Sequence, residues 1–391
     1  MKKRLLAVLM GLVMTVALVG CGSNNTEVND TKANNASVGE KQTETGDSVS
    51  TETTTYPKEK VLIGVELYDP TDSETIAIQE YFAKLAKTYN VEFKYSEAIA
   101  DADSEMKFIE DCAMAGCKGF IGYYNVTGLE QVQSVIDYGM YFYGMDEDEV
   151  YEEFGENENY LGIVSAGGDD YDAGKALGEW VMEKGYTNVV YANGGADFGV
   201  DQFVKRQNGF MDAIDDSVEV TVVSGFPGDQ FFADQSSALS KQGLQAVVAS
   251  FNGVDFWAQP IASAGLAGTV ELATIGSVNT TYVDAFEGGL CSFLVSKNVD
   301  TFGFGIAAIC NAVDGNADAW RADGKALRMS TEFWKIANAE DCKTLNDVMK
   351  SEGVYTAEQL MSLSVAVNEN VTVDTVKDLV ATGTMEAILN R

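Results

Sequence analysis

Short apolar runs alternate with segments of helical periodicity along the first half of the chain. Four runs of apolar residues are found, at positions 61–67, 91–95, 119–123 and 140–144. The segments between them place apolar residues on one helical face, and a glycine such as Gly116 or Gly139 follows two of them. Strands that alternate with glycine-ended helices predict a parallel sheet with helices on both faces.

The same alternation continues to about residue 313. The further apolar runs lie at 160–164, 188–192, 218–223, 246–250, 270–275 and 291–295. A single parallel sheet of about ten strands would be unusually wide. We therefore predict an α/β fold with two doubly wound parallel-sheet lobes. Ligands of such sheets bind beyond the carboxyl ends of the strands, so we expect a site between the lobes.

The N-terminus has the features of an export signal. A basic start, Met1-Lys2-Lys3-Arg4, precedes an uncharged run at 5–19 that is shorter than the roughly 20 residues of a membrane span. The run ends in Leu18-Val19-Gly20-Cys21, which resembles a bacterial lipobox. The resemblance implies cleavage after residue 20 and a lipid on Cys21. The alternative is an uncleaved anchor with an incidental cysteine.

Residues 21–59 are expected to form a disordered tether. They are rich in Asn, Thr, Ser and Glu and contain almost no apolar residue. Such a segment cannot bury enough apolar surface to offset the entropy lost on ordering. We expect it to hold a folded domain away from a bacterial membrane, either on the outer face of the cell membrane or in the periplasm.

The charge balance and the lack of histidine exclude several classes of function. The chain carries 60 acidic and 26 basic residues, a net charge of −34, so we expect no nucleic-acid partner. It contains no histidine, which removes Ser-His-Asp and Cys-His catalysis and His-ligated zinc. Carboxylate or lysine chemistry remains open, but we predict that the protein is not an enzyme.

No cofactor or metal is expected. Apart from Cys21 the cysteines form no CxxC pair, so we interpret most of them as buried small residues; one disulfide remains possible. The pattern Asp314-x-Asn316-x-Asp318 has calcium-loop spacing. Ala319 stands where such a loop needs Gly, and Lys325 stands where it needs Glu, so a polar turn is predicted there.

Four segments resemble the type I periplasmic solute-binding family, in its ribose- and galactose-binding cluster. They are DSEMKFIEDCAMAGCKGFIGY (103–123), YFYGMD (141–146), GGDDYDAGKALG, which ends at Gly178, and RQNGF (206–210). The similarity covers about residues 60 to 335. It implies three chain crossings between the lobes, near 165–168, 295–298 and 327–333. The first lobe would then comprise 60–166 plus 297–328. The second would comprise 167–295 plus 330–391, including a helical tail without an assigned role.

The resemblance implies two polar ligand contacts. Asp146 follows the fourth strand, where the family places a carboxylate that accepts hydrogen bonds from ligand hydroxyls; the alternative is one more solvated acid. Arg206 opens the RQNGF motif and would grip ligand oxygens with its planar donor fork. Its alternative role is an arginine on a helix surface.

An amide and several aromatic side chains near strand ends complete the predicted site. Asn252 follows a strand and is either an amide contact, an N-cap for the next helix, or both. An aromatic ring can cover the C–H face of a sugar, and core packing is the equally weighted alternative. These aromatic candidates are Tyr124, Phe231, Phe251 and Trp257.

The sequence also departs from the family at three ligand positions. The family's Asn-Pro-Phe-Phe loop is replaced by Tyr68-Asp69-Pro70-Thr71-Asp72, in which Tyr68 is the candidate substitute for the missing stacking rings. Glu147 replaces an arginine, and Ser277 replaces an aspartate. With acidic side chains at the mouth and Arg206 as the lone cation, an anionic ligand is disfavoured.

The resulting hypothesis is a lipid-anchored solute-binding protein of an ABC importer. It would clamp a small neutral polar ligand, with a sugar as the first candidate, by closure of a hinge. We expect a monomer that docks on an ABC permease, which works with its ATPase. The alternatives are a lipoprotein that presents its ligand to a membrane receptor, a carboxylate-based surface glycosidase, and a purely structural lipoprotein.

Overall fold

The computed structural model describes residues 56–391. The predicted signal peptide, lipidation at Cys21 and most of the tether lie outside the described residues. The first strand, β1 (Tyr56–Glu66), includes the last four residues of the predicted tether, 56–59. Tyr56 is buried there, with its ring 6.2 Å from that of Tyr89, because the sheet offers apolar surface to this aromatic side chain. Within 56–391, no helix combines the length and apolar character that a membrane span requires.

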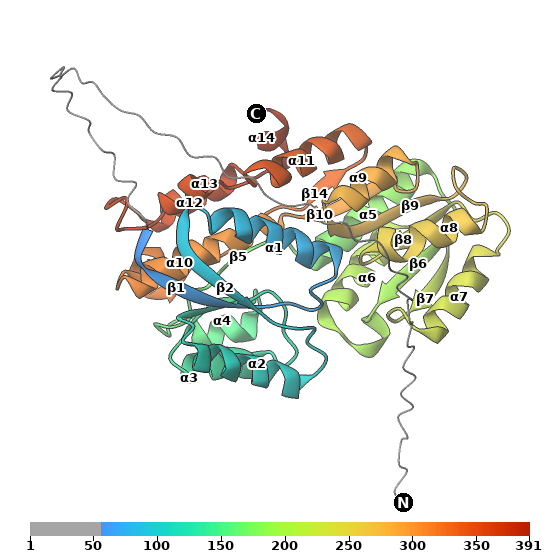
Figure 1. The fold of residues 1–391 in the computed structure, drawn as a ribbon. Helices are drawn as coiled ribbons and strands as arrows, with labels where there is room; N and C mark the ends of the chain where they lie inside the picture. The colour runs from blue at the N-terminus through green and yellow to red at the C-terminus, as the bar shows by residue number, and fades with distance from the viewer. Residues whose placement is uncertain (1–55) are drawn as a thin grey trace, which may run out of the picture. The chain divides into compact units, whose positions relative to one another are not determined.

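The first sheet has four parallel strands in the order β2-β1-β3-β4. Helices α1 and α10 pack on one face, and α2 and α3 pack on the other (Figure 1). The strands after β1 are β2 (Tyr89–Tyr95), β3 (Gly119–Gly122) and β4 (Tyr141–Gly144). The helices are α1 (Ser73–Leu85), α2 (Ala102–Ala115), α3 (Leu129–Asp137), α4 (Asp148–Phe154) and α10 (Gly303–Val313).

The second sheet has six strands in the order β14-β10-β9-β8-β6-β7. All pairs are parallel except that between β10 and β14, which is antiparallel and was not expected. The strands are β6 (Asn188–Gly194), β7 (Glu219–Ser224), β8 (Ala246–Ala249), β9 (Glu271–Ser277), β10 (Phe293–Lys297) and β14 (Trp334–Ile336). The helices are α5 (Asp170–Lys184), α6 (Asp201–Ala213), α7 (Asp229–Leu239), α8 (Gln259–Ser263) and α9 (Thr280–Glu287).

Local sequence signals account for the ends of these helices. The Asp101 side chain accepts from the Ser104 amide at the start of α2, and Gly116 ends that helix at φ 84°. Helix α5 is capped at its start by Asp169, whose side chain accepts from the Tyr171 amide, and after its end by Gly185 at φ 68°. The alternation of capped helices with buried strands gives the two α/β lobes predicted from the sequence.

Short segments connect the two sheets. Strand β5 (Ile163–Ser165) pairs in parallel with β13 (Arg328–Ser330), outside both sheets. A third connection leaves β10 through the 3-10 turn η3 (Val299–Phe302), where the Asn298 amide donates to the Ala166 carbonyl at 2.7 Å. These segments fall at the three predicted crossings, and the exact lobe boundaries stay predictions.

Four helices follow β14. They are α11 (Ala339–Ser351), α12 (Ala357–Met361), α13 (Val373–Ala381) and α14 (Met385–Leu389). The sequence assigned them to the second lobe, but they contact helices of both lobes. The five cysteines in 56–391 are all free and buried, as predicted for small core residues.

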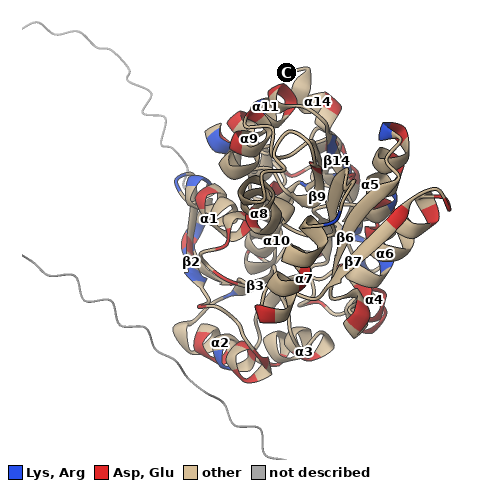
Figure 2. Ribbon diagram, turned by 90° about the vertical axis from the view of Figure 1, so that its right-hand side faces the viewer, with Lys and Arg blue, Asp and Glu red and all other residues tan. Residues whose placement is uncertain are grey.

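Exposed helix faces carry many of the acidic side chains. Figure 2 shows acidic residues along α2, α4 and α6, with fewer basic residues among them. Helix α4 is the densest case, with Asp148, Glu149, Glu152 and Glu153 within seven residues. Ionised carboxylates keep their hydration on such faces, and the apolar faces of the same helices pack on the sheets.

Candidate functional site

The predicted site residues follow the carboxyl ends of strands in both lobes. Tyr68 and Asp69 follow β1, Tyr124 follows β3, and Asp146 follows β4. Phe251 and Asn252 follow β8, and Ser277 ends β9. Open parallel sheets bind ligands at this edge, so these loops form the candidate site. Arg206 and Phe231 lie instead within helices α6 and α7.

Tyr68 and Tyr124 form an aromatic pair on the first lobe. Their ring centroids lie 5.2 Å apart with planes at 63°. Tyr68 is 55% exposed, so much of its ring is open to solvent, whereas Tyr124 is half-buried. An exposed ring held by a second ring offers a fixed face to an apolar C–H surface.

Asp69 shapes the loop that carries Tyr68. Its Oδ1 accepts from the Thr71 amide at 2.8 Å and from the Thr71 hydroxyl at 2.7 Å. These hydrogen bonds lower the pKa of Asp69, since they favour the ionised carboxylate. The Asp69 carboxylate is therefore partly engaged within its own turn.

Asp146 is paired with an arginine that the sequence analysis did not single out. The Arg328 Nε atom lies 2.6 Å from Asp146 Oδ1, and the Ser330 hydroxyl donates to Oδ2 at 3.0 Å. Arg328 also reaches Asp148 Oδ1 at 2.7 Å. Arg328 and Ser330 lie on β13, within the crossing predicted at 327–333. This position was the one feature of the sequence that indicated a role for them near the hinge.

Arg206 is buried within the second lobe rather than presented on a helix surface. It is 4% exposed, and its Nε and Nη2 lie 2.8 and 2.7 Å from Asp170 Oδ1. Its Nη1 donates to the Ser250 carbonyl at 2.8 Å. The guanidinium thus joins α6 to α5 and to the end of β8, and a direct ligand contact stays a prediction.

A group of phenylalanines lines the strand ends of the second lobe. Phe203, Phe226 and Phe251 lie with ring centroids 5.4 to 5.6 Å apart, each pair edge to face. Phe226 is 48% exposed and Phe198 is 70% exposed. The sequence analysis predicted Phe251 but missed Phe198 and Phe226, although both lie in loops that follow strands, β6 and β7.

The other aromatic candidates and Asn252 lie in different surroundings. Phe231 is 2% exposed and packs edge to face on Trp257 at 5.9 Å, so both rings belong to the core. Asn252 is half-buried at φ 30°, a left-handed backbone conformation that asparagine tolerates. Its side chain does not cap the following helical turn, so the N-cap alternative is not observed.

Glu74 at the start of α1 joins the two lobes. Its carboxylate accepts from the hydroxyls of Tyr123 and Ser277, and Lys297 Nζ lies 3.3 Å from its Oε1. Burial opposes ionisation of Glu74, but Lys297 and the two hydroxyls outweigh it and hold the pKa below its usual value. Nearby, the Ser73 hydroxyl lies 3.4 Å from Asp255 Oδ2 of the second lobe.

Ser277 therefore serves in a contact between lobes. The sequence analysis gave it as a ligand position but missed Glu74 and Lys297, which lie 203 and 20 residues from it in the chain. Lys297 had a local signal, because it ends a buried strand at a predicted crossing. Within residues 56–391, no three Cys, Asp or Glu side chains come together in a group that could hold a metal ion.

Comparison with known proteins identifies the fold. No protein-family model matches the sequence, and no curated protein matches it. Among solved structures, a periplasmic solute-binding protein of an ABC transporter from Actinobacillus succinogenes 130z, with bound D-allose, is 13% identical at a TM-score of 0.58. The match covers 72% of this chain and 99% of that chain.

Two further structures give the same result. The periplasmic binding protein of the arabinose ABC transporter from Shewanella sp. ANA-3 is 16% identical at a TM-score of 0.56, covering 74% of this chain and 96% of that one. A carbohydrate transporter from Acidothermus cellulolyticus 11B, in complex with myo-inositol, is 16% identical at a TM-score of 0.57, covering 75% and 99%. The chain has the two-lobed fold of the type I periplasmic solute-binding proteins, and the predicted fold class is confirmed.

Proposed function

We propose that this chain is the extracytoplasmic solute-binding protein of an ABC importer and binds a neutral sugar or polyol between its lobes. The observation that carries this proposal is the presence of exposed aromatic rings at the carboxyl strand ends of both lobes. Tyr68, which packs edge to face on the half-buried Tyr124, supplies the exposed ring on the first lobe, and Phe198 and Phe226 supply exposed rings on the second. Closure on a sugar would stack its two C–H faces against these rings.

The charges around the site favour a neutral ligand. Four cations near the site are already paired: Arg206 with Asp170, Arg328 with Asp146, Lys297 with Glu74, and Lys205 with Asp201. The charged neighbours of Glu147 are mainly acidic, with Lys205 offsetting part of their charge, so this carboxylate would repel an anion. Hydroxyl groups, in contrast, can donate to carboxylates and accept from amides such as Asn252.

The mechanism we propose is closure of the hinge formed by the three crossing segments. The short β5–β13 pair and the turn at Asn298 join the lobes through few residues, which can absorb a rotation by small changes in φ and ψ. The closed form would dock on a membrane permease coupled to its ATPase. In this proposal the chain is a monomer without catalytic activity, held at the membrane by a lipid on Cys21.

The test is a ligand screen on the full chain with Cys21 replaced by Ser, which removes the proposed lipid. Thermal shift would compare hexoses and pentoses in pyranose and furanose forms, and cyclic polyols, with amino acids and nucleosides. Titration calorimetry would then measure the affinity of each stabilising compound. We expect at least one sugar or polyol to bind at micromolar concentration or below. Stabilisation by an amino acid alone, or by none of these compounds, would refute the proposed ligand class.

Variants of the aromatic residues locate the binding site. Tyr68→Ala and Phe226→Ala should each weaken binding about tenfold, the equivalent of one lost stacking contact. Tyr138→Ala is the matched control, because Tyr138 is 52% exposed but follows α3 at the opposite edge of the sheet. Equal affinities for all three variants would place the ligand elsewhere.

A further inference from the structure

Residues 339–391, here called the C-terminal strap, contact both lobes. On the second lobe, α11 packs along α9, and Lys350 Nζ lies 2.6 Å from the Thr280 hydroxyl. The Trp334 indole on β14 donates to the Gly383 carbonyl at 3.1 Å. The strap is thus fixed to the second lobe near its start, by α11, and near its end, by Gly383.

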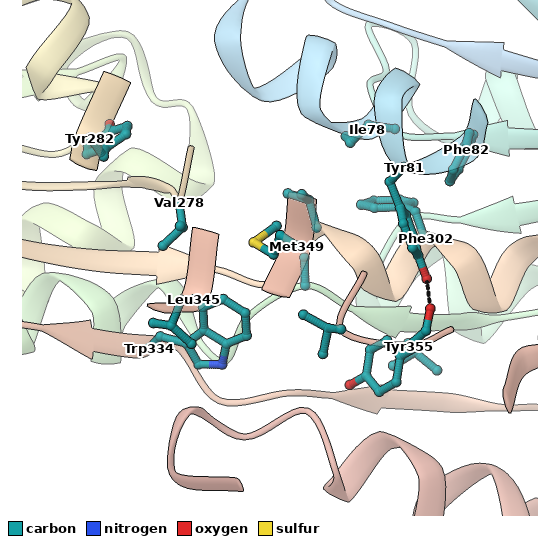
Figure 3. Packing of buried hydrophobic residues seen from close by; sticks show 14 of the residues in the cluster. Ile78, Tyr81, Phe82, Val278, Tyr282, Phe302, Trp334, Leu345, Met349 and Tyr355 are labelled. Carbon is teal, nitrogen blue, oxygen red and sulfur yellow. Dashed lines mark hydrogen bonds between the residues drawn. The ribbon is translucent and has the colours of Figure 1, made fainter. Parts of the chain in front are cut away.

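The middle of the strap is fixed to the first lobe. The Tyr81 hydroxyl of α1 donates to the Tyr355 carbonyl at 2.7 Å, drawn as a dashed line in Figure 3. Lys84, on the same helix, donates to the Met349 carbonyl at 2.7 Å. The Val354 amide donates to Asp300 Oδ2 at 2.7 Å, which fixes the strap to the turn that follows the hinge.

Helix α10 holds a second part of the strap. The Asn311 amide group donates to the Leu363 carbonyl at 2.8 Å, and its oxygen accepts from the Val365 amide at 2.9 Å. The Trp320 indole donates to the same Leu363 carbonyl at 3.2 Å. A buried asparagine that satisfies two backbone groups of another segment fixes that segment in both position and register.

Apolar packing joins the strap to both lobes in one cluster. Figure 3 shows Met349 of the strap between Tyr81 of the first lobe and Tyr282 of the second, with Leu345 and Tyr355 of the strap below them in the same cluster. Leu345, Tyr355 and two further strap residues, Val354 and Leu360, are 0% exposed. Separation of the strap from either lobe would therefore expose side chains that are now fully buried.

A groove runs along the seam between the strap and the two lobes. It has a volume of about 180 Å³ and is lined by residues of α1, α9 and α11, including Ile76, Thr281 and Asn346. The two lobes thus do not pack continuously against each other here, and the strap spans the space between them. A rotation of one lobe against the other would have to shift α11 relative to α1 or to α9.

We propose that the C-terminal strap is a built-in restraint that limits opening of the hinge. This restraint is part of the function proposed above. It requires the proposed hinge, but it does not depend on which ligand the protein binds. Opening breaks the contacts of the strap with one lobe, most simply those of 349–365 with α1, η3 and α10. A restrained protein remains closer to its binding-competent form, so less of the ligand's binding energy is used for closure.

The test compares two substitutions that each remove one buried tyrosine hydroxyl. Tyr81→Phe removes a hydrogen bond between the strap and the first lobe, whereas Tyr355→Phe removes the bond from Tyr355 to the Val380 carbonyl, which lies within the strap. Spin labels on Met114→Cys of α2 and Ser237→Cys of α7 report the distance between the lobes. Both sites are exposed, and the native cysteines of 56–391 are buried and should not take the label.

The measurement is the interlobe distance distribution by pulsed electron spin resonance without any ligand, in the chain with Cys21 replaced by Ser. The open form is the population whose interlobe distance differs from that of the structure described here. Tyr81→Phe should increase this population about threefold to tenfold, and Asn311→Ala should increase it further. Tyr355→Phe should leave the distribution unchanged. If Tyr81→Phe and Asn311→Ala leave it unchanged as well, the strap is not a restraint. If Tyr81→Phe and Asn311→Ala open the hinge but the screen finds no ligand, the proposed function is refuted and the restraint by the strap is not.

Discussion

At the scale of single residues, two buried carboxyl groups differ in how they are satisfied. Glu66 on β1 is 0% exposed, and its oxygens lie near the Glu105 and Gln131 side chains without a well-formed hydrogen bond to any residue of 56–391. Burial and the neighbouring Glu105 carboxylate raise its pKa to about 10, so Glu66 holds its proton at neutral pH. Glu105 is instead supplied with donors, including the Val126 amide at 2.6 Å and the Gln131 side chain at 3.1 Å.

Glu66→Gln should stabilise the protein, and the gain should grow with pH. The unfolded chain loses the Glu66 proton near pH 4.5, whereas the folded chain keeps it to about pH 10. Between these values the wild type loses roughly 1.4 kcal/mol of stability per pH unit, and a neutral glutamine does not. Urea unfolding at pH 6, 7 and 8 measures the difference. Glu59→Gln, at an exposed position of the same strand, should show no such trend. If Glu66→Gln instead increased stability equally at all three pH values, folded Glu66 would not be retaining a proton that the unfolded chain loses.

Asp300→Asn should increase the free energy of unfolding, and this increase should become independent of pH above about pH 7. Burial raises the pKa of Asp300 to about 7, against its usual 3.8, while the Val354 amide opposes the shift. The stability advantage of the protonated form is complete below pH 3.8 and is lost as pH rises to 7. The difference between variant and wild type should thus increase by roughly 1.4 kcal/mol per pH unit up to pH 7 and remain constant above it. The same urea series extended from pH 5 to 9 would detect the plateau; a difference that still rises above pH 8 would contradict it.

At the scale of elements, helices α5 and α6 approach each other through glycines. A Cβ atom on Gly174 would lie 1.9 Å from the Arg206 carbonyl oxygen, and one on Gly209 would lie 1.9 Å from that of Tyr171. Backbone atoms cannot move aside as a flexible side chain can, so both positions require glycine. The close approach also brings Asp170 of α5 within reach of the Arg206 guanidinium.

Gly209→Ala should destabilise the second lobe by about 2 kcal/mol or more. The added methyl group forces the two helices apart, and this strain exceeds the gain of roughly 1 kcal/mol from better helix propensity. Asn208→Ala is the control, because the adjacent position is exposed and should lose nothing. Urea midpoints of the two variants measure the contrast, and an unchanged midpoint for Gly209→Ala would show that the helices separate without cost.

Local and non-local features of this chain differ in how far the sequence predicts them. The strand–helix repeat and the glycine that ends α2 each depend on a few adjacent residues, so periodicity was enough to predict them. The crossing near Ser165 was predicted from the family resemblance instead. The hydrogen-bond partners of Arg206 were not predicted, since Asp170 and the Ser250 carbonyl come to it only through helix packing. Glu74 was missed for the same reason, because its partners lie on β9 and β10.

The strap shows the same limit for a whole segment. Three of its four helices, α11, α12 and α13, had helix signals in the sequence, whereas α14 was not predicted. Such signals do not tell which surface the apolar face of a helix covers. The contact of Asn311 with 363–365 depends on a buried polar side chain more than fifty residues away in the chain. A lone asparagine in a strongly apolar helix, GFGIAAICNAV, was the available signal.

At the scale of the whole molecule, Glu74 and the strap are separate links between the lobes. Glu74 acts at the candidate site through Ser277 and Lys297, and the strap acts through α11 and residues 349–365. The first link is polar and includes a partly exposed lysine, whereas the second is largely apolar. We therefore expect the two links to respond differently to substitution and to salt.

Glu74→Gln should increase the open population of the ligand-free protein about tenfold, because Lys297 loses its ionised partner. Glu80→Gln, at an exposed position on the same helix, is the control. The interlobe distance measurement described above applies directly. High salt should open the wild type slightly and leave Glu74→Gln unchanged, since only the charged pair is screened. An identical salt response in both proteins would assign the effect to another contact.

The buried cysteines affect how the protein can fold in different redox environments. Burial raises the pKa of the Cys291 and Cys310 thiols, and raises that of Cys342 to about 12, so almost no reactive thiolate forms at these positions. Oxidants reach these three thiols only when the chain opens locally. The packing of Cys291, Cys310 and Cys342 therefore does not depend on the formation of a disulfide at these positions.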